Sequence, residues 1–172
     1  MAEDLVRQSV LDRLIGADLV RTGGGGKGRP ARSWEESVKL LERNVLRDLE
    51  HLLNTRQVSE PAEAPFDHLA DSLYNYGLLD FASLSADAAG SADQIRRLIQ
   101  EAIERFEPRL TDVEVVDPDE GEPRPREATL RRRVRFRVEA TLRTDPDPER
   151  VEFDTVLETT SKRFEVSVEP HA

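Results

Sequence analysis

The chain has 172 residues, a net charge of −10 at pH 7, no cysteine and 3 histidines. That length is typical of one domain, and the acidic excess disfavours non-specific binding to nucleic acid or anionic lipid. Without cysteine the chain cannot form disulfides or thiolate metal sites, and we expect no metal and no cofactor. The acidic start and the lack of a long apolar run favour a cytoplasmic protein.

Residues 1–32 read as a docking arm followed by a Gly-rich linker. Ser9 is a candidate N-cap for a short apolar helix that contains Leu11 and Leu14. A helix this short is marginal alone, so we expect it to dock on a larger body. The glycine run that follows predicts a flexible linker. Residues 33–172 are expected to form a single domain.

The linker ends in Gly26-Lys27-Gly28, which has the look of a phosphate-binding loop. Such a loop needs serine or threonine after the lysine to hold magnesium, and this chain has Gly28 there. The linker interpretation is therefore favoured.

Helical patterns follow the linker. Ser33 and Glu36 form a capping box before an apolar stripe that runs to Leu53, and Asn54 can end this helix in the left-handed conformation. A weaker pattern over residues 66–76 predicts another helix, with a glycine after its end.

The cleanest helix is predicted over residues 91–106, and Pro108 stops it. Beyond it the apolar period becomes two, which predicts strands. The strand candidates are residues 113–116, 128–142, 151–158 and 164–168, with a turn at 145–148. Helices first and strands last predict an α+β fold: an antiparallel C-terminal sheet packed against about three helices and preceded by a flexible N-terminal arm.

Arginine fills alternate positions from 131 to 137, on the polar face of the longest predicted strand. Such a row can contact phosphates, but the next strand carries Glu152, Asp154 and Glu158 on its own polar face. Cross-strand ion pairs account for both rows, so we favour pairing or partner contact over nucleic-acid binding.

Glu107-Pro108-Arg109 is the one segment whose local chemistry conflicts with its position. Glu107 lies at a helix C-terminus, where the macrodipole disfavours an anion. Pro108 forces the chain out of the helix. Two readings stay open: a specific ion pair or functional contact, and an ordinary helix stop with two solvated charges.

Several segments in order make the chain resemble the TssE family, the sheath-initiator subunits of type VI secretion baseplates. This family is related to the "lysozyme-like" baseplate wedge proteins of contractile phages. The segments are Ser9 to Leu14, Arg47 to Arg56, Ser72 to Phe81, and Glu107-Pro108-Arg109-Leu110. Leu79 stands where the family usually has proline.

The resemblance implies a non-enzymatic, cytoplasmic baseplate component of a contractile injection system. It would join wedge subunits of the TssF, TssG and TssK type. It would also offer the first ring of TssB/TssC-type sheath a template by strand addition. The implied partner-binding residues are Glu107, Pro108, Arg109, Leu11 and Leu14. Alanine at Glu107 or Arg109 is expected to weaken wedge assembly more than fold stability.

A peptidoglycan hydrolase, as the relatives' label suggests, is the alternative. It would need two positioned carboxylates, one with a raised pKa. No acidic residue lies in an apolar run that would desolvate it. We therefore expect no catalytic residues.

Overall fold

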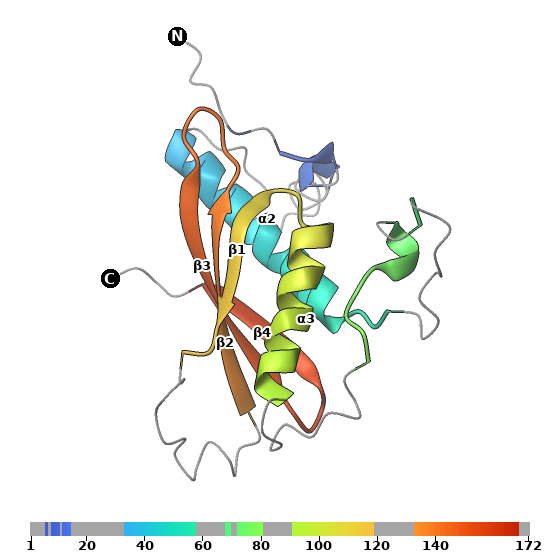
Figure 1. Ribbon diagram of the computed structural model, residues 1–172. Helices are drawn as coiled ribbons and strands as arrows, with labels where there is room; N and C mark the ends of the chain where they lie inside the picture. Colours follow the sequence, from blue (N-terminus) through green and yellow to red (C-terminus); the bar gives the residue numbers. More distant parts are fainter. Residues whose placement is uncertain are drawn as a thin grey trace, which may run out of the picture.

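The computed structural model describes residues 6, 8–10, 12–14, 33–57, 68–69, 72–80, 91–118 and 133–168. The elements in chain order are helix α2 (Trp34–Asn54), the short 3-10 helix η1 (Leu73–Asn75), helix α3 (Ser91–Phe106) and strands β1 (Leu110–Val116), β2 (Arg133–Leu142), β3 (Glu149–Glu158) and β4 (Arg163–Val168). The strands form one antiparallel sheet in the order β1-β2-β3-β4 (Figure 1). The predicted α+β fold is confirmed. The predicted linker lies outside the described residues.

Helix α2 begins as predicted but ends differently. The Ser33 hydroxyl accepts the backbone N–H of Glu36 at 3.2 Å. At the other end the left-handed residue predicted at Asn54 is wrong, because Asn54 is the last helical residue and Thr55 follows in an extended conformation. The Thr55 N–H donates to the Leu52 carbonyl. The Asn54 carboxamide is used elsewhere, on the backbone of Phe164 in β4.

The helix predicted over residues 66–76 is wrong in its described part, where only η1 is helical. Ser72 caps η1 by accepting the N–H of Tyr74 and donates its own hydroxyl to the Leu69 carbonyl. The Asn75 amide donates to the same carbonyl. Local side-chain bonds of this kind compete with continuous helix, and Leu73 is accordingly 84% exposed instead of facing the core.

The chain after η1 is fastened to the end of α2. Gln57 donates its N–H to the Leu78 carbonyl at 2.9 Å, and Leu78 donates its N–H to the Thr55 carbonyl at 2.9 Å. Gly77 makes this approach with φ 112°, in the C′ position that the sequence predicts for a glycine. The predicted site segments on either side are thereby held against each other.

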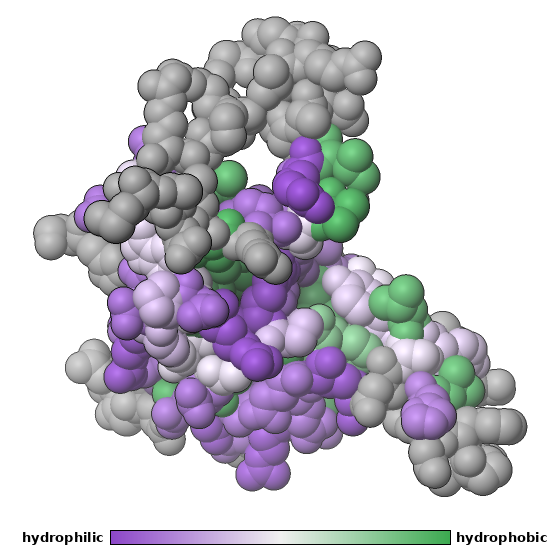
Figure 2. Space-filling view, turned by 90° about the horizontal axis from the view of Figure 1, so that it is seen from above, coloured by the Kyte–Doolittle hydropathy of each residue, from purple (hydrophilic) through white to green (hydrophobic). Residues whose placement is uncertain are grey.

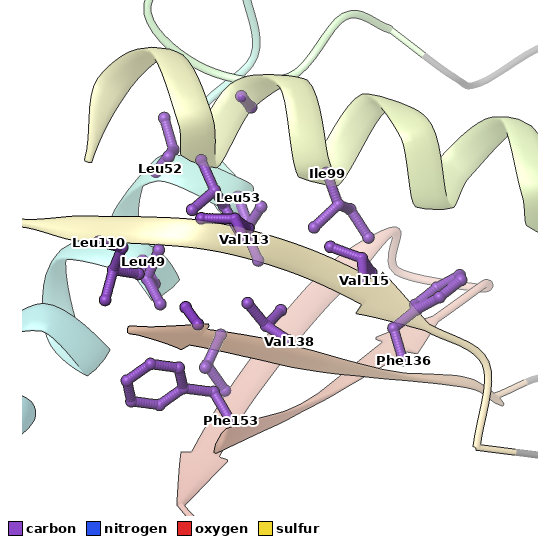
Figure 3. Packing of buried hydrophobic residues seen from close by; sticks show 14 of the residues in the cluster. Leu49, Leu52, Leu53, Ile99, Leu110, Val113, Val115, Phe136, Val138 and Phe153 are labelled. Atoms are coloured by element: carbon purple, nitrogen blue, oxygen red, sulfur yellow. The ribbon is translucent and has the colours of Figure 1, made fainter. Parts of the chain in front are cut away.

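The core lies between the two long helices and one face of the sheet. Side chains alternate between buried and more exposed along β2 and β3, as the period of two predicts. Helix α3 packs over β1, with Ile99 pointing toward Val115, and α2 packs beside β4 (Figure 3). Phe136 and Phe153 are 1% and 0% exposed. Among the described helices, none is both long and apolar enough to cross a membrane.

One arginine of the β2 row forms the expected cross-strand ion pair with β3. Arg137 lies opposite Asp154 and its Nε is 3.1 Å from Asp154 Oδ1. Arg150 of β3 reaches Glu139 at 2.5 Å. Arg133 lies opposite Glu158. At least one of the arginines is therefore neutralised within the sheet instead of being presented to phosphates.

Thr155 is a polar residue on the buried face of β3, at 0% exposure. Its hydroxyl has no hydrogen-bond partner among the described residues. Because an unpaired buried hydroxyl loses its hydration without compensation, Thr155→Val is expected to stabilise the fold by about 1 kcal/mol in denaturant unfolding. Thr111→Val is the matched control, since the Thr111 hydroxyl donates to the Thr141 carbonyl and its loss should not stabilise. A destabilised Thr155→Val variant would show that the hydroxyl is bonded in solution.

Candidate functional site

The junction between α3 and β1 places a carboxylate inside the protein. Helix α3 ends at Phe106, and Glu107 still donates its N–H to the Ile103 carbonyl while accepting the N–H of Leu110. Pro108 between them prevents the helix from continuing and is exposed. Glu107 is only 4% exposed, so its charge needs a partner.

Arg109 supplies that partner by folding back on Glu107. Its Nε donates to Glu107 Oε1 at 2.6 Å, its Nη2 bonds to Oε2, and its backbone N–H donates to Oε1 at 3.2 Å. A forked guanidinium–carboxylate pair of this kind is among the stronger hydrogen-bonded contacts in proteins. Of the two readings of this segment, the structure supports the specific ion pair.

The pair is part of a larger group that we name the ion cluster: Asp12, Arg47, Asp48, Glu107 and Arg109. Arg109 Nη2 lies 2.6 Å from Asp48 Oδ2, and its Nη1 lies 3.7 Å from Asp12 Oδ2. Arg47 Nη2 lies 2.8 Å from Asp12 Oδ1 and 2.7 Å from Asp48 Oδ1. Two guanidinium groups thus join the arm, the middle of α2 and the junction between α3 and β1.

The electrostatics of the ion cluster favour the charged forms. Burial tends to raise the pKa of Asp12, but hydrogen bonds from Arg47 and Ser9, with the charges of both arginines, outweigh it and hold this pKa below the ordinary 3.8. Burial tends to lower the pKa of Arg109, yet the contacts with Glu107 and Asp48 raise it. The same balance raises the pKa of Arg47. Asp12, Arg47 and Arg109 are therefore held in their charged forms by the ion pairs that they make.

Tyr76, on the segment fastened to α2, lies near this cluster. Its ring meets that of Phe106 edge-on, with centroids 5.4 Å apart. Burial, followed by the negative charges of Asp48 and Glu107, raises its pKa above 10.0. The segment that carries Tyr76 and the helix–strand junction therefore share one environment.

The N-terminal arm is attached to α2 of its own chain. Val6 donates its N–H to the Ser37 hydroxyl at 3.2 Å, and the Gln8 side chain bonds both the Ser37 carbonyl and the Asn44 amide. Ser9 caps the arm helix as predicted, accepting the Asp12 N–H at 3.0 Å. Asp12, 7% exposed, then enters the ion cluster. The most buried residue of the described part of the arm is thus a carboxylate, and the partly buried Val6 packs against the hydrophobic core.

A model of the family described as "Baseplate wedge protein gp25" matches residues 39–147, well over half of the chain. The chain belongs to this family. It is therefore a structural component of a baseplate. No curated protein matches the chain. A chain in a solved structure, "The baseplate complex from the type VI secretion system", is similar with 18% identity and a TM-score of 0.44, covering 69% of this chain and 94% of that chain. The family assignment rests on the sequence match.

The predicted partner-binding residues of this wedge protein lie in different settings. Glu107 and Arg109 belong to the ion cluster, with side chains 6% and 24% exposed, and Pro108 lies exposed between them. Leu14 is 60% exposed at the end of the described arm, outside the cluster. Leu11 lies outside the described residues. Their role in partner binding remains a prediction.

Sequence reasoning missed three members of the ion cluster: Asp12, Arg47 and Asp48. Arg47 and Asp48 fall inside the helix segment that carries the family resemblance, and Asp48 borders the apolar stripe, three residues after the buried Val45. A charged residue beside a buried stripe is a signal that a buried partner exists. Asp12 gives no such signal, because its arginine partners are 35 residues or more away.

Acidification is expected to release the arm. Because the folded pKa of Asp12 lies below 3.8, its ionised form stabilises arm docking fully above about pH 4, and that contribution is lost as the pH falls through the lowered value. Energy transfer from Trp34, the single tryptophan, to a dye on Val10→Cys reports docking. We expect the transfer to fall below about pH 4 while circular dichroism still shows a folded domain.

In the matched variant Asp12→Asn the transfer should be weaker at pH 7 and nearly independent of pH until the domain unfolds. Transfer that stays constant in the unaltered arm until the domain itself unfolds would contradict the role of the Asp12 carboxylate.

Proposed function

We propose that this wedge protein is a non-enzymatic component of a cytoplasmic type VI secretion baseplate. In this role it joins the wedge and templates the first ring of sheath by strand addition. The observation that supports the proposal is the ion cluster: its acidic groups are bound by two arginines that tie the arm, α2 and the α3–β1 junction together. Such a cluster fixes the shape of a surface instead of performing chemistry.

The wedge-facing surface is proposed to lie around Pro108 and the arm. Glu107 is too buried to touch a partner directly, so it acts as a positioning residue that holds Arg109 and presents Pro108. Leu14, with Val10 64% exposed one helical turn earlier, supplies apolar contact. Figure 2 shows hydrophobic side chains in separate groups on a largely hydrophilic face, which suits several small contacts. The partners would be wedge subunits of the TssF, TssG and TssK type.

Sheath templating is proposed for the antiparallel sheet. A sheet with open edges can accept a strand from another chain, with main-chain hydrogen bonds giving affinity and alternate side chains setting the register. The sheath partners would be of the TssB/TssC type. Among the described strands, β1 and β4 are the outer ones, on which such addition could take place.

The hydrolase alternative is the weaker proposal. A glycosidase acid needs a carboxyl group whose pKa is raised by an apolar setting. In the ion cluster the pKa of Asp12 is lowered, and Asp48 and Glu107 both bond to Arg109. The lowered pKa of Asp12 argues against its acting as such an acid, and Asp48 and Glu107 serve as ion-pair partners of Arg109.

Affinity purification of the tagged full-length chain from its native host, with partners identified by mass spectrometry, tests the proposal. We expect wedge and sheath subunits in the purified material. Leu14→Asp should reduce wedge recovery, whereas Leu73→Asp, at a more exposed leucine outside the arm, should not. Recovery of cell-wall fragments without wedge subunits would overturn the proposal in favour of the hydrolase.

A further inference from the structure

The two outer strands of the sheet differ in what they offer a neighbouring chain. In β1 the register with β2 shifts between Thr111 and Glu114, and Asp112 has a left-handed φ of 52°. Further along, the Arg96 side chain of α3 donates to the Val115 carbonyl at 3.3 Å. A bulge re-aims the backbone and interrupts pairing, so β1 does not present a continuous row of hydrogen-bonding groups.

Strand β4 pairs with β3 without any shift of register from Arg163 to Val168. Its first outward position is occupied by a side chain from α2. Asn54 accepts the Phe164 N–H through Oδ1 at 2.9 Å and donates through Nδ2 to the Phe164 carbonyl at 2.9 Å. The carboxamide thus makes the same two bonds that one residue of a neighbouring antiparallel strand would make.

The backbone N–H and C=O of Phe164 point away from β3, and this fixes the direction of the backbone groups in the residues that follow. Backbone groups alternate along a strand, so the amides of Val166 and Val168 point away from β3 as well. Among the residues that the structure describes, no side-chain hydrogen bond reaches either of them. Val168 is also only half-buried, although it packs against the core. The later half of β4 therefore has open hydrogen-bonding groups beside incompletely covered apolar surface.

We propose that the edge of β4 from Val166 onward receives the added strand, and that Asn54 marks where this strand stops and so fixes its register. The occupant is an extended segment of a partner chain with apolar residues at every second position. Those residues would lie beside Val166 and Val168, and the intervening polar ones beside the exposed Glu165 and Ser167. The inference rests on the proposed function, under which the partner is a sheath subunit.

Site-specific photo-cross-linking tests the choice of edge. A photoreactive amino acid replaces Ser167 on β4 or Glu114 on β1, both exposed, in the tagged full-length chain in its native host. We expect a cross-link to a sheath subunit from position 167 and none from position 114. A sheath cross-link from position 114, alone or at equal yield, would overturn the assignment of β4.

The same purification separates this inference from the proposed function. If wedge subunits are recovered but neither position cross-links to sheath, sheath templating and the β4 assignment both fail, while the wedge role stands. If no wedge subunits are recovered, the wedge role itself fails.

Two substitutions test the role assigned to individual residues. Val168→Pro removes an outward N–H and no bond to β3, so the cross-link from position 167 should fall by roughly fivefold, while the lost Val168 packing lowers the melting temperature by only about a few degrees. Asn54→Ala removes the two side-chain bonds to the Phe164 backbone, so a photoreactive residue at Arg163, silent with Asn54 present, should begin to cross-link to sheath. An unchanged pattern in a folded Asn54→Ala variant, checked by its circular dichroism, would show that Asn54 does not set the register.

Discussion

Arg109→Ala is expected to destabilise the fold by about 3 kcal/mol, because it removes one partner of a buried ion pair and leaves the other charge uncompensated. Glu107 is 4% exposed and loses both side-chain bonds from Arg109. Asp48 and Asp12 lose a cation as well. We place the loss at the lower end of the range for buried pairs because the Arg109 side chain is 24% exposed. Denaturant unfolding at pH 7 measures it.

A double variant separates the effect of the unpaired Glu107 charge from the other effects of removing Arg109. Glu107→Gln combined with Arg109→Met removes both charges and keeps similar volumes, so it should recover most of the stability that Arg109→Ala loses. If the double variant is as unstable as Arg109→Ala, the loss comes from packing or from the cation that Asp48 and Asp12 lose, and not from an unpaired Glu107. The structure thus adds a stability cost to the sequence-based expectation that substitutions here act mainly on assembly.

Gly77→Ala is expected to destabilise the fold by at least about 3 kcal/mol. Gly77 has φ 112°, which L-residues with a side chain rarely adopt. An added Cβ would also lie far inside van der Waals contact of the Thr55 carbonyl oxygen and 2.9 Å from its carbon. That oxygen accepts the Leu78 N–H, so relieving the clash breaks the bond that fastens this segment to α2.

The control for this substitution is Leu79→Ala, two residues on, where the side chain is 43% exposed. It should change the unfolding free energy by no more than about 0.5 kcal/mol. A Gly77→Ala variant as stable as the parent would mean that the end of α2 and the segment after η1 can move apart at little cost. The Tyr76 ring, which packs on Phe106, would then not depend on this attachment.

The elements with an uninterrupted period could be predicted from the sequence, because their apolar faces meet the core directly. Helix α3 and the strands follow their patterns closely. The helix predicted over residues 66–76 was wrong at Ser72 and Asn75. Their side chains make local hydrogen bonds to the backbone, and a pattern of apolar residues cannot predict such bonds. The predicted ending of α2 was wrong for a long-range reason, because the Asn54 side chain bonds to the backbone of Phe164, 110 residues away.

The candidate site could be predicted in part, through local conflict. An anion at a helix end followed by proline and arginine identified Glu107 and Arg109, and the structure pairs them. Asp48 and Arg109 are 61 residues apart in the chain, so no spacing connects them before the fold is known. Leu14 was identified by apolar pattern, yet the buried anchor of the described arm is Asp12.

The central claim is that the ion cluster shapes a surface on which the baseplate wedge assembles. Wedge recovery with the tagged Glu107→Gln, Arg109→Met variant, once shown to be folded, tests it most directly. We predict strongly reduced recovery of wedge subunits at near-normal stability, because the ion pair that positions Pro108 is gone and the arm loses its contact with Arg109. Full recovery of wedge subunits with this variant would contradict the claim and reduce the ion cluster to an internal support of the fold.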